Sequence, residues 1–163
     1  MDGRALLSEF DHEATLTRKT LERVPFDKGD WKPHEKSMPL RELASHVADI
    51  PSWVEVTMNQ DVFEMDGPYE LPRVDDVEAL LEAFDRNTAN ARAALEKASG
   101  EDLMGIWTMK SGGEEVISMP RAAILRGFCF NHAVHHRAQL GVYLRLLDVP
   151  VPSIYGPSAD EAE

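Results

Sequence analysis

Four long segments of the sequence repeat apolar residues every three or four positions, the spacing that places them on one face of an α-helix. They span approximately residues 3–23, 38–54, 75–100 and 118–148. Pro51 interrupts the second segment, so we expect a kink or local break there rather than a separate helix. Four amphipathic helices joined by loops predict an all-α fold, an antiparallel four-helix bundle.

The segments between and after these helices are rich in turn-forming residues. Residues 61–73 contain one glycine and two prolines and are predicted to form a loop. The pair Gly112-Gly113 lies between two short apolar runs, which allows either a small hairpin or an irregular loop. Residues 149–163 contain three prolines and a glycine, so we expect an extended tail with a mobile acidic tip. No linker or repeat divides the chain, and residues 1–163 are predicted to form one domain.

The charge of the chain argues against two classes of partner. Seventeen basic and 29 acidic side chains give a formal net charge of -12, and the resulting field repels nucleic acid and anionic membrane surfaces. We find neither the apolar stretch of a signal peptide nor an apolar run long enough to span a bilayer. The single cysteine, Cys129, cannot form an internal disulfide, which is typical of a reducing compartment. We therefore expect a cytoplasmic protein without nucleic-acid or membrane partners.

Two histidines of the fourth segment have the spacing of metal ligands. His132 and His136 are four residues apart, so their side chains project from the same face of the helix. Leu140 lies on that face, which indicates that the pair points into the fold. Two inward imidazoles can form hydrogen bonds to neighbours, or they can share a metal ion that binds one nitrogen of each ring. The pair alone leaves both interpretations open.

His46 is the candidate third ligand. It lies in the second segment, one turn before Ile50 and at the edge of the apolar stripe, where it faces a neighbouring helix. Three histidines that leave positions open on a divalent cation are typical of catalytic rather than structural sites. Cys129 lies three residues before His132 and is a further candidate donor, although the favoured interpretation is a small buried side chain.

Several other polar side chains near these three have open roles. Asp49 could accept the second N–H of His46 or act as a base, although a solvated acid on a helix surface is the simpler interpretation. Arg137 points away from the histidine face, which favours an ion pair or an interface role over catalysis. The residues whose roles remain open from the sequence are Asp49, His34, His135, Gln139 and Tyr143.

Two stretches of sequence carry a distinctive combination of motifs. FDKGDWKPHEKSMPLRELASHVADIP contains LxxH, and NHAVHHRAQLGVYLRLLDVPVPSIYGPSADE contains HxxHHRxQ. This combination resembles the DinB family, the DinB/YfiT-like metalloenzymes. The resemblance implies a four-helix bundle, commonly a homodimer, that holds nickel or zinc through His46, His132 and His136. Ala138 stands where the family motif most often has glycine, a change that leaves all three ligands in place.

The resemblance also implies a reaction on a small molecule. A three-histidine metal site can lower the pKa of bound water for hydrolysis, or it can bind a thiol as the thiolate. We therefore expect a divalent-metal-dependent hydrolase or thiol-dependent S-transferase whose substrate is unidentified, with a low-molecular-weight thiol as the candidate co-substrate. The alternative is a helical bundle that binds a metal or ligand without turnover, because no unambiguous general base accompanies the histidines.

Overall fold

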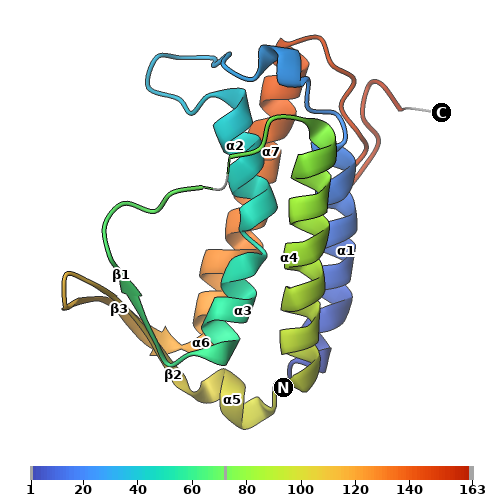
Figure 1. The fold of residues 1–163 in the computed structure, drawn as a ribbon. Coiled ribbons are helices and arrows are strands. Elements are labelled where there is room, and N and C mark those ends of the chain that lie inside the picture. Colours follow the sequence, from blue (N-terminus) through green and yellow to red (C-terminus); the bar gives the residue numbers. More distant parts are fainter. Residues whose placement is uncertain (1, 72, 162–163) are drawn as a thin grey trace.

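The computed structural model describes residues 2–71 and 73–161, and its long helices lie side by side with a small sheet at one end (Figure 1). The long helices are α1 (Arg4–Leu21), α2 (Leu40–Asp49), α3 (Ser52–Asn59), α4 (Val77–Lys97) and α7 (His132–Leu146). The shorter helical elements are the 3-10 turn η1 (Phe26–Lys28), α5 (Gly100–Met104), α6 (Arg121–Ile124) and the π-helical segment η2 (Leu125–Asn131). The strands are β1 (Val62–Met65), β2 (Ile106–Ser111) and β3 (Glu114–Pro120).

The three strands form a mixed sheet in the order β1-β2-β3, with β1 parallel to β2 and β2 antiparallel to β3. The prediction of an all-α four-helix bundle is therefore wrong, because the chain combines its helices with a sheet and forms an α/β fold. Of the two alternatives for the segment before the last helix, the hairpin forms. The prediction of a loop over residues 61–73 is also wrong in part, because β1 lies within these residues. A four-residue strand carries too little pattern to be recognised, and its partner is distant in the sequence.

The hairpin depends on the two glycines of its turn. Gly112 and Gly113 join β2 directly to β3 and have φ angles of 58° and 83°. A two-residue turn with both central residues in the left-handed region matches the twist of the flanking strands, and glycine adopts it without strain. Trp107 of β2 is fully buried and packs with Ile124 of α6, which fixes the hairpin against the helices.

The second helical segment breaks at Pro51, as predicted, but the break separates two helices. Pro51 has no N–H to continue the helical hydrogen bonding, so α2 ends at Asp49 and α3 begins at Ser52. α3 continues in roughly the direction of α2 (Figure 1). Its C-terminal carbonyls are satisfied by the buried guanidinium of Arg121, which donates to the carbonyl of Thr57 at 2.8 Å.

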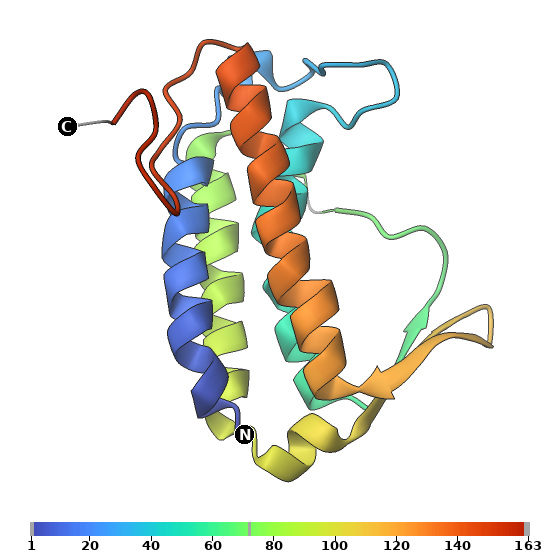
Figure 2. The same ribbon diagram turned by 180° about the vertical axis from the view of Figure 1, so that it is seen from behind.

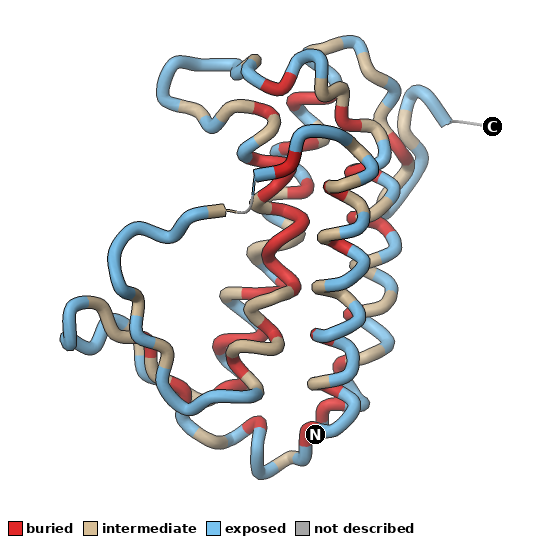
Figure 3. Tube along the Cα trace, in the orientation of Figure 1, coloured by how far each residue is buried: buried red, intermediate tan, exposed pale blue. Residues whose placement is uncertain are grey.

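The core lies between the inward faces of the long helices, where buried positions recur along each helix (Figure 3). Leu43 and Val47 of α2 and Leu140 of α7 belong to one buried cluster. The apolar stripes predicted from the sequence thus pack α2 against α7. This packing positions the two helices that carry the candidate ligands. Among the helices of the described residues, none has the length and apolar content needed to cross a membrane.

The C-terminal segment turns back along α1 and α7 (Figure 2). Asp160 accepts hydrogen bonds from Arg145 at 3.2 Å and from the Val151 N–H at 2.8 Å, and Glu161 pairs with Arg23 of the α1 end. Arginines on the neighbouring elements thus pair with these two acids, and the mobility of the tip stays a prediction. Residues 162–163, which complete the predicted tip, lie outside the described residues.

Candidate metal centre

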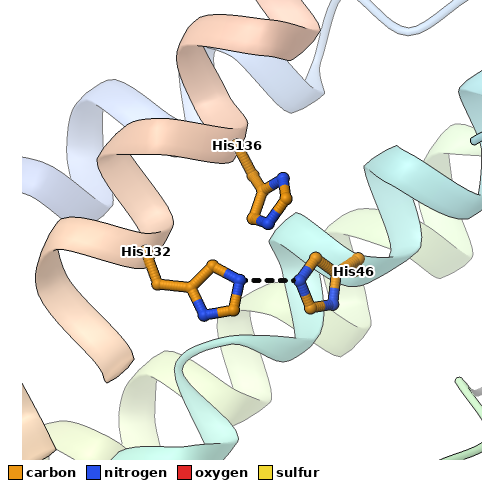
Figure 4. Close-up of side chains that lie close together, drawn as sticks. All are labelled: His46, His132 and His136. Atoms are coloured by element: carbon orange, nitrogen blue, oxygen red, sulfur yellow. Dashed lines mark hydrogen bonds between the residues drawn. The ribbon is translucent and has the colours of Figure 1, made fainter. Parts of the chain in front are cut away.

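Three histidine side chains converge between α2 and α7 (Figure 4). His46, His132 and His136 each offer one nitrogen to a group whose atoms all lie within 4.8 Å of one another. The Nε2 atoms of His46 and His132 are 3.1 Å apart. Nitrogens bound to one ion at about 2.0–2.1 Å lie about 2.8–3.0 Å apart in octahedral geometry and about 3.3–3.4 Å apart in tetrahedral geometry. The first two nitrogens thus have the spacing of ligands to a common ion.

The π-helical segment η2 orients the first of the α7 histidines. The backbone N–H of His132 donates to the Cys129 carbonyl, and Nδ1 of the same residue lies 3.2 Å from the Phe128 carbonyl. A carbonyl only accepts hydrogen bonds, so Nδ1 carries the proton and Nε2 presents its lone pair to the other histidines. π-Helical turns inside α-helices are frequent at functional sites because they redirect backbone groups in this way.

A side-chain amide orients the second of the α7 histidines, His136. Nδ1 of His136 lies 2.7 Å from Oε1 of Gln139, one turn further along α7. The amide oxygen accepts the Nδ1 proton, which leaves Nε2 of His136 free to bind a metal. Gln139 therefore positions a candidate ligand, a role that the sequence alone did not distinguish from orienting a substrate or from a hydrogen bond in the core.

The environment keeps all three imidazoles neutral near pH 7. Burial, together with the neighbouring rings of His136 and His132, lowers the pKa of His46 to about 4. Burial also lowers the pKa values of His132 and His136. Neutral imidazole is the form that binds a metal, so the site does not need to lose protons before it takes up a cation.

The model of the DinB family matches residues 1–163. The chain belongs to the DinB family. A DinB-like protein from Bacillus cereus has a similar structure, with a TM-score of 0.71, 20% identity, and coverage of 93% of this chain and 97% of that one. A DinB-like protein from Bacillus subtilis gives a TM-score of 0.69, 20% identity, and coverage of 98% and 99%. At this identity the two structures show a shared fold. No curated protein matches the chain significantly.

The two other candidate histidines of this DinB protein lie outside the three-nitrogen group. His135 is exposed, and its ring packs edge-on against that of His136 with centroids 4.9 Å apart. His34 is also exposed, and its Nδ1 accepts a hydrogen bond from the Lys36 N–H at 3.2 Å in the turn before α2. His135 thus flanks a candidate ligand, and His34 stabilises a local turn.

Two residues that were predicted to lie near the histidines belong to the core. Tyr143 is buried, donates to the Met38 carbonyl at 3.1 Å and packs edge-on against Trp31. Cys129 is buried among apolar side chains, which raises the pKa of its thiol to about 12. A neutral buried thiol fits the favoured interpretation of Cys129 as a packing residue rather than a donor.

Asp49 differs from two of the three sequence-based interpretations, the solvated surface acid and the acceptor for His46. Its side chain is neither solvated nor bonded to His46: the residue is 7% exposed and accepts hydrogen bonds from Tyr69 and, at 3.4 Å, from Ser52. Within residues 2–71 and 73–161, no Lys, Arg or His nitrogen forms an ion pair with Asp49. Burial raises the pKa of this carboxyl group. No sequence pattern indicates this arrangement, because Tyr69 lies in a loop distant from α2 in the chain.

Gln139→Ala is expected to weaken metal binding by about 10- to 100-fold, the usual effect of removing a group that orients a histidine ligand. The measurement is a competition titration of zinc against a chromophoric chelator. Gln139→Glu is the matched control, because its carboxylate still accepts the Nδ1 proton and should keep the affinity within a few-fold of the parent. Equal losses in both variants would contradict the orienting role.

Lowering the pH is expected to destabilise the metal-free protein between about pH 6.5 and pH 4. The unfolded chain protonates His46 near its ordinary pKa of about 6.5, whereas the folded chain does so near pH 4. Protons therefore bind preferentially to the unfolded state in this window, and the free energy of unfolding falls as the pH falls. Urea unfolding at a series of pH values measures the slope.

His46→Gln should make that slope shallower, because one of the contributing groups is gone. His12→Gln, which removes an exposed histidine of α1, is the matched control and should leave the slope of the parent. A slope that is the same in the parent and in His46→Gln would show that the neutral state of His46 contributes nothing to stability.

Proposed function

We propose that this DinB protein is a divalent-metal-dependent enzyme and that His46, His132 and His136 hold nickel or zinc. The observation that carries the proposal is the convergence of three imidazole nitrogens, two of them on rings oriented by the Phe128 carbonyl and the Gln139 amide. Three protein ligands on such an ion leave room for water or a substrate atom. The three rings are partly exposed, so a small molecule can reach them from solvent.

Thiol-dependent S-transfer fits the surroundings of the histidines better than hydrolysis. When bound, the metal would supply a Lewis acid that holds a thiol as its thiolate or activates water. Hydrolysis commonly needs a base as well, and the carboxylate nearest in sequence, Asp49, is buried and occupied by Tyr69 and Ser52. A thiol has an ordinary pKa of about 8.5, against about 15.7 for water, so it would lose its proton to solvent on binding the metal more readily than water does, and S-transfer relies less on a base at the site.

The test is thiol consumption by protein loaded with nickel or zinc. The metal-loaded parent is expected to accelerate the loss of a thiol in the presence of an electrophile such as 1-chloro-2,4-dinitrobenzene. The metal-free parent and metal-treated His136→Ala should not. Activity on nitrophenyl esters without a thiol would favour the hydrolase. One bound equivalent of metal with neither activity would favour a metal-binding protein without turnover.

We also propose that the protein acts in the cytoplasm as a homodimer. The single cysteine is buried and supports a reducing compartment. Val142 and Leu146 of α7 are 58% and 56% exposed and lie four residues apart on one helix face, and a second copy of the chain could cover them. Sedimentation equilibrium of the parent and of Val142→Glu would test this face, and a monomeric parent would contradict it.

A further inference from the structure

Four aromatic side chains form a continuous cluster beside the metal centre, which we call the aromatic wall: Trp53, Phe63, Tyr69 and Phe128. The Trp53 ring lies at its middle, with centroid distances of 5.0 Å to Phe63, 5.3 Å to Tyr69 and 6.4 Å to Phe128. Phe128 in turn packs perpendicular to the ring of His132 at 5.8 Å. The wall therefore begins at the side chain of a candidate metal ligand.

The aromatic wall keeps part of its ring surface open. Trp53, Phe63 and Phe128 are only partly buried, and Tyr69 is 45% exposed. The helices and the sheet already have a sealed contact in the fully buried Trp107. Trp53, Phe63 and Phe128 pack one side of their rings against this buried contact, and the rest of their ring surface, together with the Tyr69 ring, stays partly exposed. Partly exposed aromatic groups beside polar ligands are typical of small-molecule sites.

Tyr69 is held in the aromatic wall by an unusual anchor. Its hydroxyl donates to the carboxylate of Asp49, a buried group without an ion-pair partner among the described residues, one turn after His46 on α2. Burying a carboxylate is unfavourable unless hydrogen bonds compensate for its lost hydration. The fold nevertheless places this acid where it fixes the ring of a loop residue next to the metal centre. Proteins commonly retain such an unfavourable burial at functional sites whose groups must be held in one geometry.

We propose that the aromatic wall binds a planar apolar group, an aromatic or conjugated ring, of a thiol substrate whose sulfur reaches the metal centre. This inference rests on the proposed function and narrows its substrate class. The perpendicular and tilted arrangement of the rings leaves faces and edges against which one more ring can pack. The adjoining histidines supply the polar end of the site, so one ligand can contact both.

The test compares two thiols on protein loaded with cobalt(II), whose absorption changes when a thiolate binds. Benzyl mercaptan carries a ring, and propane-1-thiol is the aliphatic probe. The parent is expected to bind benzyl mercaptan at least tenfold more tightly. Tyr69→Ala and Phe128→Leu should each reduce that ratio to threefold or less, with the larger loss of affinity falling on benzyl mercaptan. Tyr155→Ala, which removes an exposed ring from the C-terminal segment, is the matched control and should keep the parent ratio.

Tyr69→Phe keeps the ring and removes the anchor to Asp49, so it should lower the ratio by less than Tyr69→Ala does. Cobalt stoichiometry and thermal unfolding of each variant establish that the fold and the metal centre are intact. Equal affinities of the parent for the two thiols, or a preference that survives both Tyr69→Ala and Phe128→Leu, would overturn the inference while the thiol chemistry stands. No spectral change with either thiol would overturn the proposed thiol chemistry and the inference with it.

Discussion

His46→Ala is expected to abolish stoichiometric metal binding. The untagged parent should retain about one equivalent of transition metal after dialysis, whereas the variant keeps only the two histidines of α7. Those two rings still offer a chelating pair, but the ion loses the one ligand that comes from a second helix. We expect the affinity to fall by more than about 100-fold, beyond the effect of removing an outer hydrogen-bond partner. Elemental analysis of the dialysed proteins measures the difference.

His135→Ala is the informative control, because it removes a neighbouring imidazole that lies outside the three-nitrogen group. It should retain the metal, and His132→Ala and His136→Ala should each lose it. The ligand assignment would be wrong if His135→Ala released the metal while His136→Ala kept it. A parent that refuses both nickel and zinc would make the three histidines core residues and leave the metal-dependent function without support.

The long helices were predictable because their apolar spacing extends over many turns. α1 and α4 lie where the periodicity places them, and Asp76 caps α4 by accepting a hydrogen bond from the Ala79 N–H at 2.8 Å. The fold class was not predictable, because it depends on the sheet. β1 becomes a strand through its parallel pairing with β2, a contact made after α4 and α5 return the chain to the same end. A tertiary contact of this kind leaves little trace in local sequence.

The candidate ligands were partly predictable for a related reason. Helix geometry alone places His132 and His136 on one face, because they are four residues apart. The position of His46 relative to them depends on how α2 packs against α7. The hydrogen bonds that orient the candidate ligands could not be predicted from the sequence. The Phe128 carbonyl that lies against His132 belongs to η2, which is π-helical, whereas the pattern of apolar residues predicts a regular helix through that point. The burial of Asp49 likewise depends on a loop whose path the sequence does not specify.

Arg137→Ala is expected to destabilise the fold by about 3–5 kcal/mol, the cost of leaving one member of a buried ion pair unpaired. The arginine is 3% exposed and pairs with the Glu13 carboxylate at 2.7 Å, as its position away from the histidine face predicts. It also donates to Thr17 at 3.2 Å and to the Tyr155 hydroxyl at 2.6 Å. One side chain therefore joins α1, α7 and the C-terminal segment, and urea unfolding measures its contribution.

Arg145→Ala provides the comparison, since its pair with Asp160 also joins α7 to the C-terminal segment but is more exposed. An exposed pair contributes less than about 1 kcal/mol. The loss of unfolding free energy should therefore be several-fold larger in Arg137→Ala than in Arg145→Ala. Combining Arg137→Met with Glu13→Leu should recover part of the loss, because no unpaired charge is then buried. A loss below about 1 kcal/mol in Arg137→Ala would contradict the buried pair. Folded Arg137→Ala should still bind one equivalent of metal, because the arginine stabilises the helices and lies outside the three-nitrogen group.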